Sequence, residues 1–282
     1  MGEASYAPVA SRPGSDDRLH TLQHMPDRRP IVARAAAAGL AVALLAGCTE
    51  ESRQASDPVT EDDAAVLATL LHRNHEQGGA DFVVTAPFAD EAVLTLTGQI
   101  DFRRAVGQAQ AVTTVGDEEV DTRTLFFDGD ELWSGDLPGL PEALAAAGAP
   151  SATYLRRALP AAGEQPQLID VVVQVLQNLS ARTADDPAAF LGDPYAFEGE
   201  QPVDGRPTTV YRLREGRTVA VADGDATLVR YRTPLPGGGA ELTVTLTDHG
   251  TRRLALPGEE ETAAAADHPV IAEAFGIQGA SG

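Results

Sequence analysis

The chain has 282 residues and a formal net charge of −21, and its basic residues are all arginine. Nucleic-acid binding is disfavoured, because contacts to phosphates need a basic surface. The acidic surface also repels anionic lipid headgroups, so any membrane attachment must come from another feature. A single cysteine excludes an intramolecular disulfide. The lack of lysine, with 27 glycines and 19 prolines, is typical of a GC-rich genome such as that of an actinobacterium.

A secretory signal that ends in a lipid-attachment site is predicted before residue 48. Arg28, Arg29 and Arg34 precede an apolar run at residues 35–45, and the tetrapeptide Leu-Ala-Gly-Cys at 45–48 ends that run. A basic segment, about 7–15 apolar residues and small residues at the cleavage point make up a secretory signal. The run is shorter than the roughly 20 residues that span a bilayer. The tetrapeptide resembles a bacterial lipobox, whose cysteine is acylated and becomes the new N-terminus.

The chain is therefore expected to have four parts. Residues 1–47 are the signal, with Met25 as the expected start of translation, and residues 48–59 are a tether that begins at the lipidated Cys48. Residues 60–257 form one domain, and residues 258–282 form an acidic tail. Two acyl chains on Cys48, at about 0.8 kcal/mol per buried methylene, would hold the protein on the extracytoplasmic face of the cell membrane. The alternative is an ordinary buried cysteine that follows an alanine-rich helix.

The first part of the domain is predicted to be one helix followed by an antiparallel meander. Thr60 is a capping residue before three acidic residues, and leucines at helical spacing continue toward Gly78 and Gly79. Apolar residues then alternate with polar ones over residues 94–102, as in a half-buried strand. Further strands are predicted at 111–115, 120–127 and 132–133, with turns at 116–117 and 128–129.

The middle of the domain is predicted to be helical. Helices are expected at residues 141–147, 152–159, 168–179 and 185–191. The helix at 168–179 is apolar nearly all round, so it must be enclosed on most sides or line an apolar space. A buried strand is the competing assignment, since four of its residues are valine, but the length favours a helix.

Strands resume in the last part of the domain. They are expected at residues 195–198, 208–214, 218–222, 227–233, 241–247 and 252–256, joined by glycine-containing turns. A short helix is expected near residues 270–275 of the tail. Helices thus gather in the middle of a chain that otherwise forms strands. This order predicts an α+β fold with an antiparallel sheet rather than a Rossmann-type domain.

Two segments downstream of the lipobox carry a resemblance to a known family. Residues 200–205, Glu-Gln-Pro-Val-Asp-Gly, lead into a strand at 208–211, and residues 247–250, Thr-Asp-His-Gly, lead to Leu256 and Pro257. From residue 64 to residue 257 the chain resembles the actinobacterial LppX/LprG lipoproteins, which share a half-barrel fold with the lipoprotein carrier LolA. The resemblance implies a curved antiparallel sheet with helices on its concave face. The resemblance also implies that the sheet and these helices enclose an apolar cavity for acyl chains of glycolipids, phospholipids or triacylglycerols.

The implied cavity would be lined by the first strands of the sheet and by the apolar helix. The expected lining residues are Leu94, Leu96, Phe102, Leu168, Val172, Val175, Leu176 and Leu179. The expected function is to carry or present a lipid, glycolipid or other apolar molecule in the cell envelope. The same residue types fill ordinary cores, so the alternative is a non-catalytic interaction or assembly lipoprotein with a filled interior. Its acidic face would bind a basic envelope protein.

Neither catalysis nor a cofactor is expected. Ser134 and Ser180 lack a Gly-x-Ser-x-Gly setting, and no P-loop or dinucleotide-binding motif is present in the sequence. His72 and His75 lie three residues apart on the first predicted helix, without a cysteine or a third histidine nearby in sequence. They are expected to be solvated residues on the polar face of that helix rather than metal ligands.

Overall fold

The structure is a computed structural model that describes residues 53–161, 166–235 and 239–277. The predicted signal, the lipobox and Cys48 lie outside these residues. The helices are α1 (Glu61–Gln77), α2 (Leu140–Ala146), α3 (Leu168–Gln177) and α4 (Pro269–Ala274), with 3₁₀ turns η1 (Pro187–Phe190), η2 (Arg214–Gly216), η3 (Glu259–Glu261) and η4 (Ala265–Asp267). Among the residues described, no helix has the length and apolarity needed to cross a bilayer.

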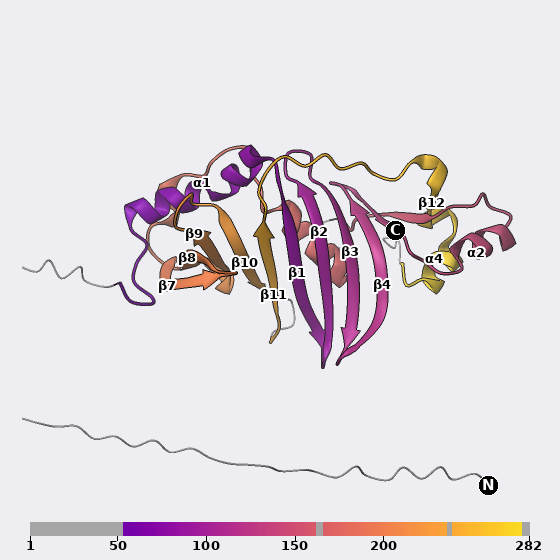
Figure 1. Cartoon of the computed structure of the whole chain (residues 1–282), viewed down its shortest axis with the longest axis horizontal. Coiled ribbons are helices and arrows are strands. Elements are labelled where there is room, and N and C mark those ends of the chain that lie inside the picture. The colour runs from indigo at the N-terminus through magenta and orange to yellow at the C-terminus, as the bar shows by residue number, and fades with distance from the viewer. Residues whose placement is uncertain (1–52, 162–165, 236–238, 278–282) are drawn as a thin grey trace, which may run out of the picture. The chain divides into compact units, whose positions relative to one another are not determined.

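The strands form a single sheet within the described part of the chain (Figure 1). They are β1 (Gly79–Ala89), β2 (Ala92–Asp101), β3 (Val106–Val115), β4 (Glu118–Phe127), β5 (Glu131–Ser134), β6 (Tyr154–Ala158), β7 (Ala196–Val203), β8 (Arg206–Arg212), β9 (Thr218–Ala222), β10 (Leu228–Pro234), β11 (Glu241–Thr247) and β12 (Thr262–Ala264). Their spatial order is β12-β6-β5-β4-β3-β2-β1-β11-β10-β9-β8-β7. Neighbours are antiparallel, except that β12 is parallel to β6.

The order of the strands shows how the chain builds this sheet. β1 to β6 extend it outward in one direction, and β7 to β11 return from the far edge toward β1. β11 then pairs with β1, where Phe82 lies opposite Leu246. The predicted α+β class with a curved antiparallel sheet is confirmed.

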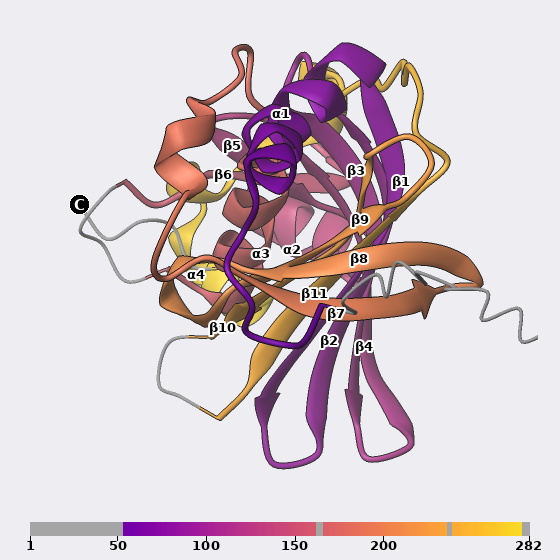
Figure 2. The same ribbon diagram turned by 90° about the vertical axis from the view of Figure 1, so that its left-hand side faces the viewer.

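Helices α1 and α3 lie on the concave face of the sheet, as predicted (Figure 2). α1 begins at the predicted cap Thr60 and ends at Gly78, whose φ of 97° is the left-handed conformation that glycine adopts at little cost. The apolar segment predicted as a helix at 168–179 forms α3, so the helix assignment is confirmed over the competing strand, despite its valines.

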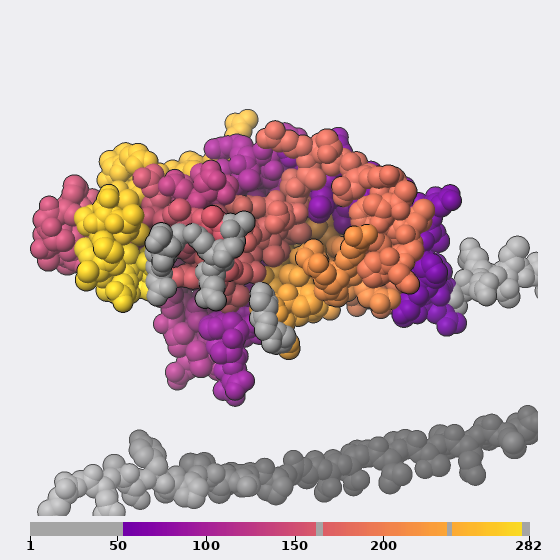
Figure 3. Space-filling model, turned by 180° about the vertical axis from the view of Figure 1, so that it is seen from behind, coloured from indigo at the N-terminus to yellow at the C-terminus, as the bar shows by residue number. Residues whose placement is uncertain are grey.

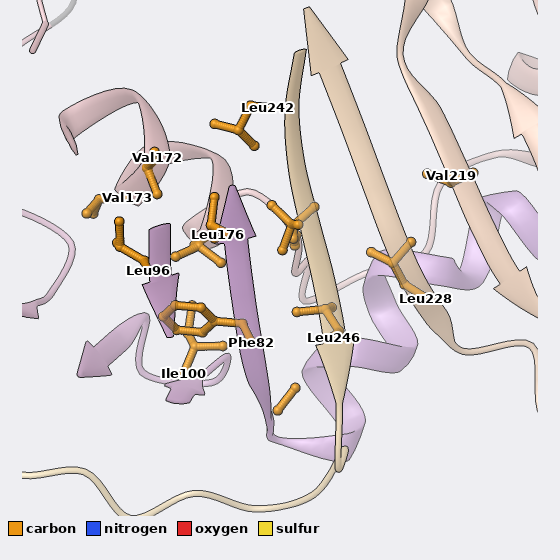
Figure 4. Close-up of a cluster of buried hydrophobic side chains, with 14 of the residues drawn as sticks. Phe82, Leu96, Ile100, Val172, Val173, Leu176, Val219, Leu228, Leu242 and Leu246 are labelled. Carbon is orange, nitrogen blue, oxygen red and sulfur yellow. The ribbon is translucent and has the colours of Figure 1, made fainter. Parts of the chain in front are cut away.

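The centre of the core lies between α3 and the first strands. Phe82, Leu96 and Ile100 alternate inward along β1 and β2 and are at most 1% exposed. Val172, Val173 and Leu176 of α3 point toward them (Figure 4). Burial of one such side chain contributes roughly 1.5–3 kcal/mol, so this contact fixes α3 on the sheet.

Several segments differ from the prediction. The helix expected at 152–159 is wrong, because residues 154–158 form β6, and Leu155 and Arg157 alternate inward with every second residue buried. The strand expected at 252–256 is also wrong. That segment has no ladder partner in the described chain, and side-chain contacts such as Arg104 to the carbonyl oxygen of Leu254 (2.9 Å) hold it instead. Strand β1, at the middle of the sheet, was not predicted.

Both ends of the described domain are packed against the sheet. In the predicted tether, the Ser56 amide donates to the carbonyl of Phe197 on β7 at 2.8 Å, and the Arg53 guanidinium lies 4.2 Å from the centre of the Phe197 ring. In the predicted tail, β12 extends the sheet beside β6. Ala272 of α4 and Ile277 pack in a second apolar cluster with residues of α2. The domain therefore includes residues outside the predicted range of 60–257.

Candidate ligand-binding site

Two cavities lie on the concave side of the sheet, one toward each end of α3. The first, cavity 1, has a volume of about 400 Å³ and lies between the first turn of α3 and strands β2 to β5. Its apolar lining consists of Phe88, Leu94, Ala111, Leu125, Leu132, Leu168, Ile169 and Ile277. Phe88 is 50% exposed, so it marks the side on which the cavity meets solvent.

The charged groups of cavity 1 are matched in pairs. Arg157 lines the cavity, and its Nη2 lies 2.5 Å from Oδ1 of Asp170, with both side chains at most 4% exposed. Asp170 also accepts a hydrogen bond from the backbone amide of Gln167 at 2.8 Å, and this bond caps the start of α3. At the mouth, the Arg123 Nε lies 2.8 Å from a carboxylate oxygen of Asp121. Cavity 1 is therefore an apolar space whose guanidinium groups are already neutralised.

The second, cavity 2, has a volume of about 350 Å³ and lies between α1, the last turn of α3 and strands β9 and β10. Its apolar lining consists of Leu67, Leu70, Leu71, Val175, Leu179, Phe190, Leu213 and Val219. Tyr195, Tyr231, Arg214 and Arg217 bring polar groups to it. The ring centres of Phe190 and Tyr195 are 5.2 Å apart, so these two residues form one aromatic wall.

Residues at the start of α1 hold one wall of cavity 2 against the sheet. Asp63 is the third residue of α1, and it accepts hydrogen bonds from the Tyr211 hydroxyl at 2.7 Å and the Thr60 amide at 2.9 Å. Its carboxylate also pairs with Arg53 at 2.8 Å. Burial raises the pKa of Asp63, but these hydrogen bonds outweigh burial and hold that pKa below its ordinary value. Burial, and then the hydrogen bond to Asp63, raise the pKa of Tyr211.

The eight predicted lining residues do not surround a single cavity. Leu94 and Leu168 line cavity 1, whereas Val175 and Leu179 line cavity 2. The other four line neither cavity and are buried in the core: Leu96, Phe102, Val172 and Leu176. α3 therefore separates two spaces, where one continuous cavity was expected.

The polar residues of both cavities were not predicted. Arg157 follows another arginine in a segment assigned as helix, so no sequence pattern marked it as buried. Alternation of Leu155 and Arg157 on one face was the available signal, and it extends over too few residues to outweigh helical spacing. Arg214 sits beside a Glu-Gly turn and resembles any solvated turn residue in sequence.

The comparisons with known proteins show likeness only to solved structures. No family model and no curated protein matches the sequence. An uncharacterized conserved protein from Thermus thermophilus is 9% identical, with 72% of this chain and 99% of that chain covered and a TM-score of 0.36. A LolA superfamily protein from Nitrosomonas europaea is 12% identical, with 70% and 96% covered and a TM-score of 0.25. At these values neither likeness says what this chain binds, and membership of the LppX/LprG family stays a prediction.

Proposed function

We propose that the protein is a membrane-anchored lipoprotein that binds the apolar part of a lipid or glycolipid in cavity 1 and carries or presents it in the cell envelope. The observation that carries this proposal is the cavity itself. Its volume of about 400 Å³ falls in the lower part of the range of about 300–1,000 Å³ typical of small-molecule sites. Leu94 and Leu168, two of the residues expected from the sequence to line a ligand cavity, form part of its wall.

The electrostatics of cavity 1 favour an uncharged occupant. A charged group brought into an apolar space must find a partner, because an unpaired buried charge is strongly unfavourable. Arg157 and Arg123 already have carboxylate partners, so neither is available without breaking an ion pair. An acyl chain or another apolar group needs no such partner and gains free energy from leaving water, at roughly 25 cal/mol per Å².

Attachment to the membrane is the second part of the proposal. The whole chain has a net charge of −21, and an acidic protein surface does not favour anionic membranes. Acyl chains on Cys48 would supply the anchor on the extracytoplasmic face. A Cys48→Ala variant should leave the membrane fraction as a soluble species or accumulate with its signal uncleaved. Recovery of cleaved, membrane-bound protein from that variant would contradict the anchor.

The test of cavity 1 is lipid extraction and native mass spectrometry of the purified protein, comparing Leu168→Trp with wild type. Leu168 lines the cavity, so the larger indole should fill much of it and reduce co-purified lipid at least several-fold. Leu191→Trp is the matched control, because Leu191 is 44% exposed and lines neither cavity. Equal lipid content in all three proteins, or none in wild type, would rule out the carrier proposal.

One observation favours an alternative, an envelope interaction protein. The tips of the β1–β2 and β3–β4 hairpins project from the rest of the domain (Figures 2 and 3). They expose Phe88, Val115 and Val120 at 46–55% beside two Asp-Glu turns, at 90–91 and 117–118. Apolar residues framed by acidic ones suit a partner protein with a basic rim. Partner binding that weakens steeply with added salt would support this alternative, whereas lipid uptake into cavity 1 should barely respond.

A further inference from the structure

Cavity 2 is a separate space from cavity 1. The two share no lining residue, and the filled core around Val172 and Leu176 lies between them. The floor of cavity 2 is made by three leucines of α1 together with Val175 and Leu179 of α3. Such a floor accepts an apolar chain as readily as the wall of cavity 1 does.

The mouth of cavity 2 differs from that of cavity 1 in its charged groups. The turn between β8 and β9 places Arg214 and Arg217 there, with Glu215 and Gly216 at φ values of 59° and 72°. Arg217 pairs with Glu215 at 2.5 Å. The Arg214 guanidinium lies 5.4 Å from the centre of the Tyr195 ring. Among the residues that the structure describes, no carboxylate lies within ion-pair distance of Arg214.

The other polar groups at this mouth add hydrogen-bond donors and one further acid. Tyr231 lines the cavity, and burial raises the pKa of its phenol, which therefore stays a neutral donor. Asn178 contributes an amide, and Asp185 is an exposed carboxylate on the same rim. Within the described part of the chain, Arg214 is therefore a cation without a paired carboxylate, and it lies beside an aromatic ring at the opening of an apolar space.

We propose that cavity 2 is a second binding site, for a long-chain carboxylic acid whose chain lies along the leucines of α1 and whose carboxylate pairs with Arg214. Guanidinium groups bind carboxylates through two parallel, charge-assisted hydrogen bonds. The cation–π contact with Tyr195 orients the guanidinium before the ligand arrives, which lowers the entropic cost of binding. This site is distinct from the neutral site proposed in cavity 1, and either can be absent without the other.

The test uses the purified full chain and two probes with the same tail, oleic acid and its methyl ester. Arg214→Gln should weaken oleate binding about tenfold, as expected for the loss of a charge-assisted hydrogen bond, and leave the ester unchanged. Arg212→Gln is the matched control. Arg212 follows the buried Tyr211 on β8, so it points to the opposite face of the sheet, where it pairs with Glu198. Affinities are measured by isothermal titration calorimetry.

Cavity-filling variants locate the bound acid. Val175→Trp, in cavity 2, should abolish oleate binding, whereas Leu168→Trp, in cavity 1, should leave it intact. Loss of oleate binding in Leu168→Trp alone would move the acid to cavity 1 and overturn the proposal. Equal loss of acid and ester affinity in Arg214→Gln, or no loss of either, would also overturn it. Arg214 is exposed, so its variant keeps the test valid even if Val175→Trp does not fold.

None of these outcomes repeats the test of cavity 1. The proposed carrier function fails if Leu168→Trp retains the lipid content of wild type. The second-site proposal fails if Arg214→Gln and Val175→Trp bind oleate with the same affinity as wild type. The two proposals are therefore separated by which variant responds and to which probe.

Discussion

The first turns of α1 and α3 are built alike and differ in their surroundings. Each helix carries an aspartate at its third position, Asp63 or Asp170, which caps the helix and pairs with an arginine from another part of the chain. The pair at α3 is at most 4% exposed. At α1 the arginine, Arg53, is 32% exposed, and a tyrosine hydroxyl supplies a further bond. The ion pair is thus sealed from water at α3, whereas at α1 its arginine is partly exposed to water.

This difference shows which helix the fold fixes more firmly. Removing one partner of a buried ion pair leaves an uncompensated charge, whereas an exposed partner is rehydrated. We expect α3 to be the rigid divider between the cavities and the start of α1 to be the wall that yields more easily. The following predictions, from the largest expected effect to the smallest, test that ranking.

Asp170→Ala should lower the free energy of unfolding by about 3–5 kcal/mol, because it leaves the buried Arg157 without its carboxylate partner and removes the cap of α3. Chemical denaturation measures the loss. The double variant Asp170→Ala with Arg157→Leu should recover part of it, since no buried charge then lacks a partner. A double variant less stable than the single one would show that burial of the pair is not the source of the effect.

Asp63→Ala should cost about 2 kcal/mol, from the lost cap of α1 and the lost bond to Tyr211. Arg53 can turn to water, so the loss should be smaller than for Asp170. Asp62→Ala, at an exposed acid in the same turn, serves as the control and should change stability by less than about 0.5 kcal/mol. If Asp63→Ala were the more damaging of the two aspartate changes, the ranking of the helices would be reversed.

Tyr211→Phe should cost about 1 kcal/mol, because it removes one hydrogen bond and keeps the ring that packs edge-on against Phe197. In the Asp63→Ala background the same change should have little further effect. A double-mutant cycle in denaturant measures this coupling. Additive losses would mean that the hydroxyl stabilises the fold without Asp63.

Acid titration should reveal the contribution of Asp63 to stability by its pH dependence. The folded pKa of Asp63 lies below its ordinary value, so the unfolded state takes up the proton first as the pH falls. The stability that Asp63 contributes is full above about pH 4 and is lost as the pH falls through the folded pKa. Wild type and Asp63→Asn should therefore converge in stability as the pH falls below about 4. If the two curves of stability against pH stayed parallel, a group other than Asp63 would be responsible for the pH dependence.

The sequence predicted elements wherever local pattern and long-range pairing agree. The cap at Thr60, the helix at 168–179 and the meander after residue 94 carry their own periodicity, and all three are present. β6 is the opposite case. Its five residues become a strand because β5 and β12 flank them, and helical spacing alone could not reveal those neighbours.

The candidate site was less predictable than the fold, for a physical reason. Leu94 and Leu96 lie two residues apart on one face of β2, yet the first lines a cavity and the second is sealed in the core. Their difference depends on where α3 crosses the sheet, which no local pattern specifies. Pairing of Arg157 with Asp170 and the lack of a partner for Arg214 among the described residues likewise depend on contacts between distant segments.

The closing of the sheet between β1 and β11 also bears on how fast the domain can fold. Asp81 lies beside Thr247 in that pair, so the two strands come from opposite ends of the domain sequence. Each half can form neighbouring hairpins early, since those pairings are local. Joining the halves must meet the entropy of closing a very long loop, a cost that slows folding more than it lowers stability. We therefore expect formation of the β1–β11 seam to limit the folding rate of this domain.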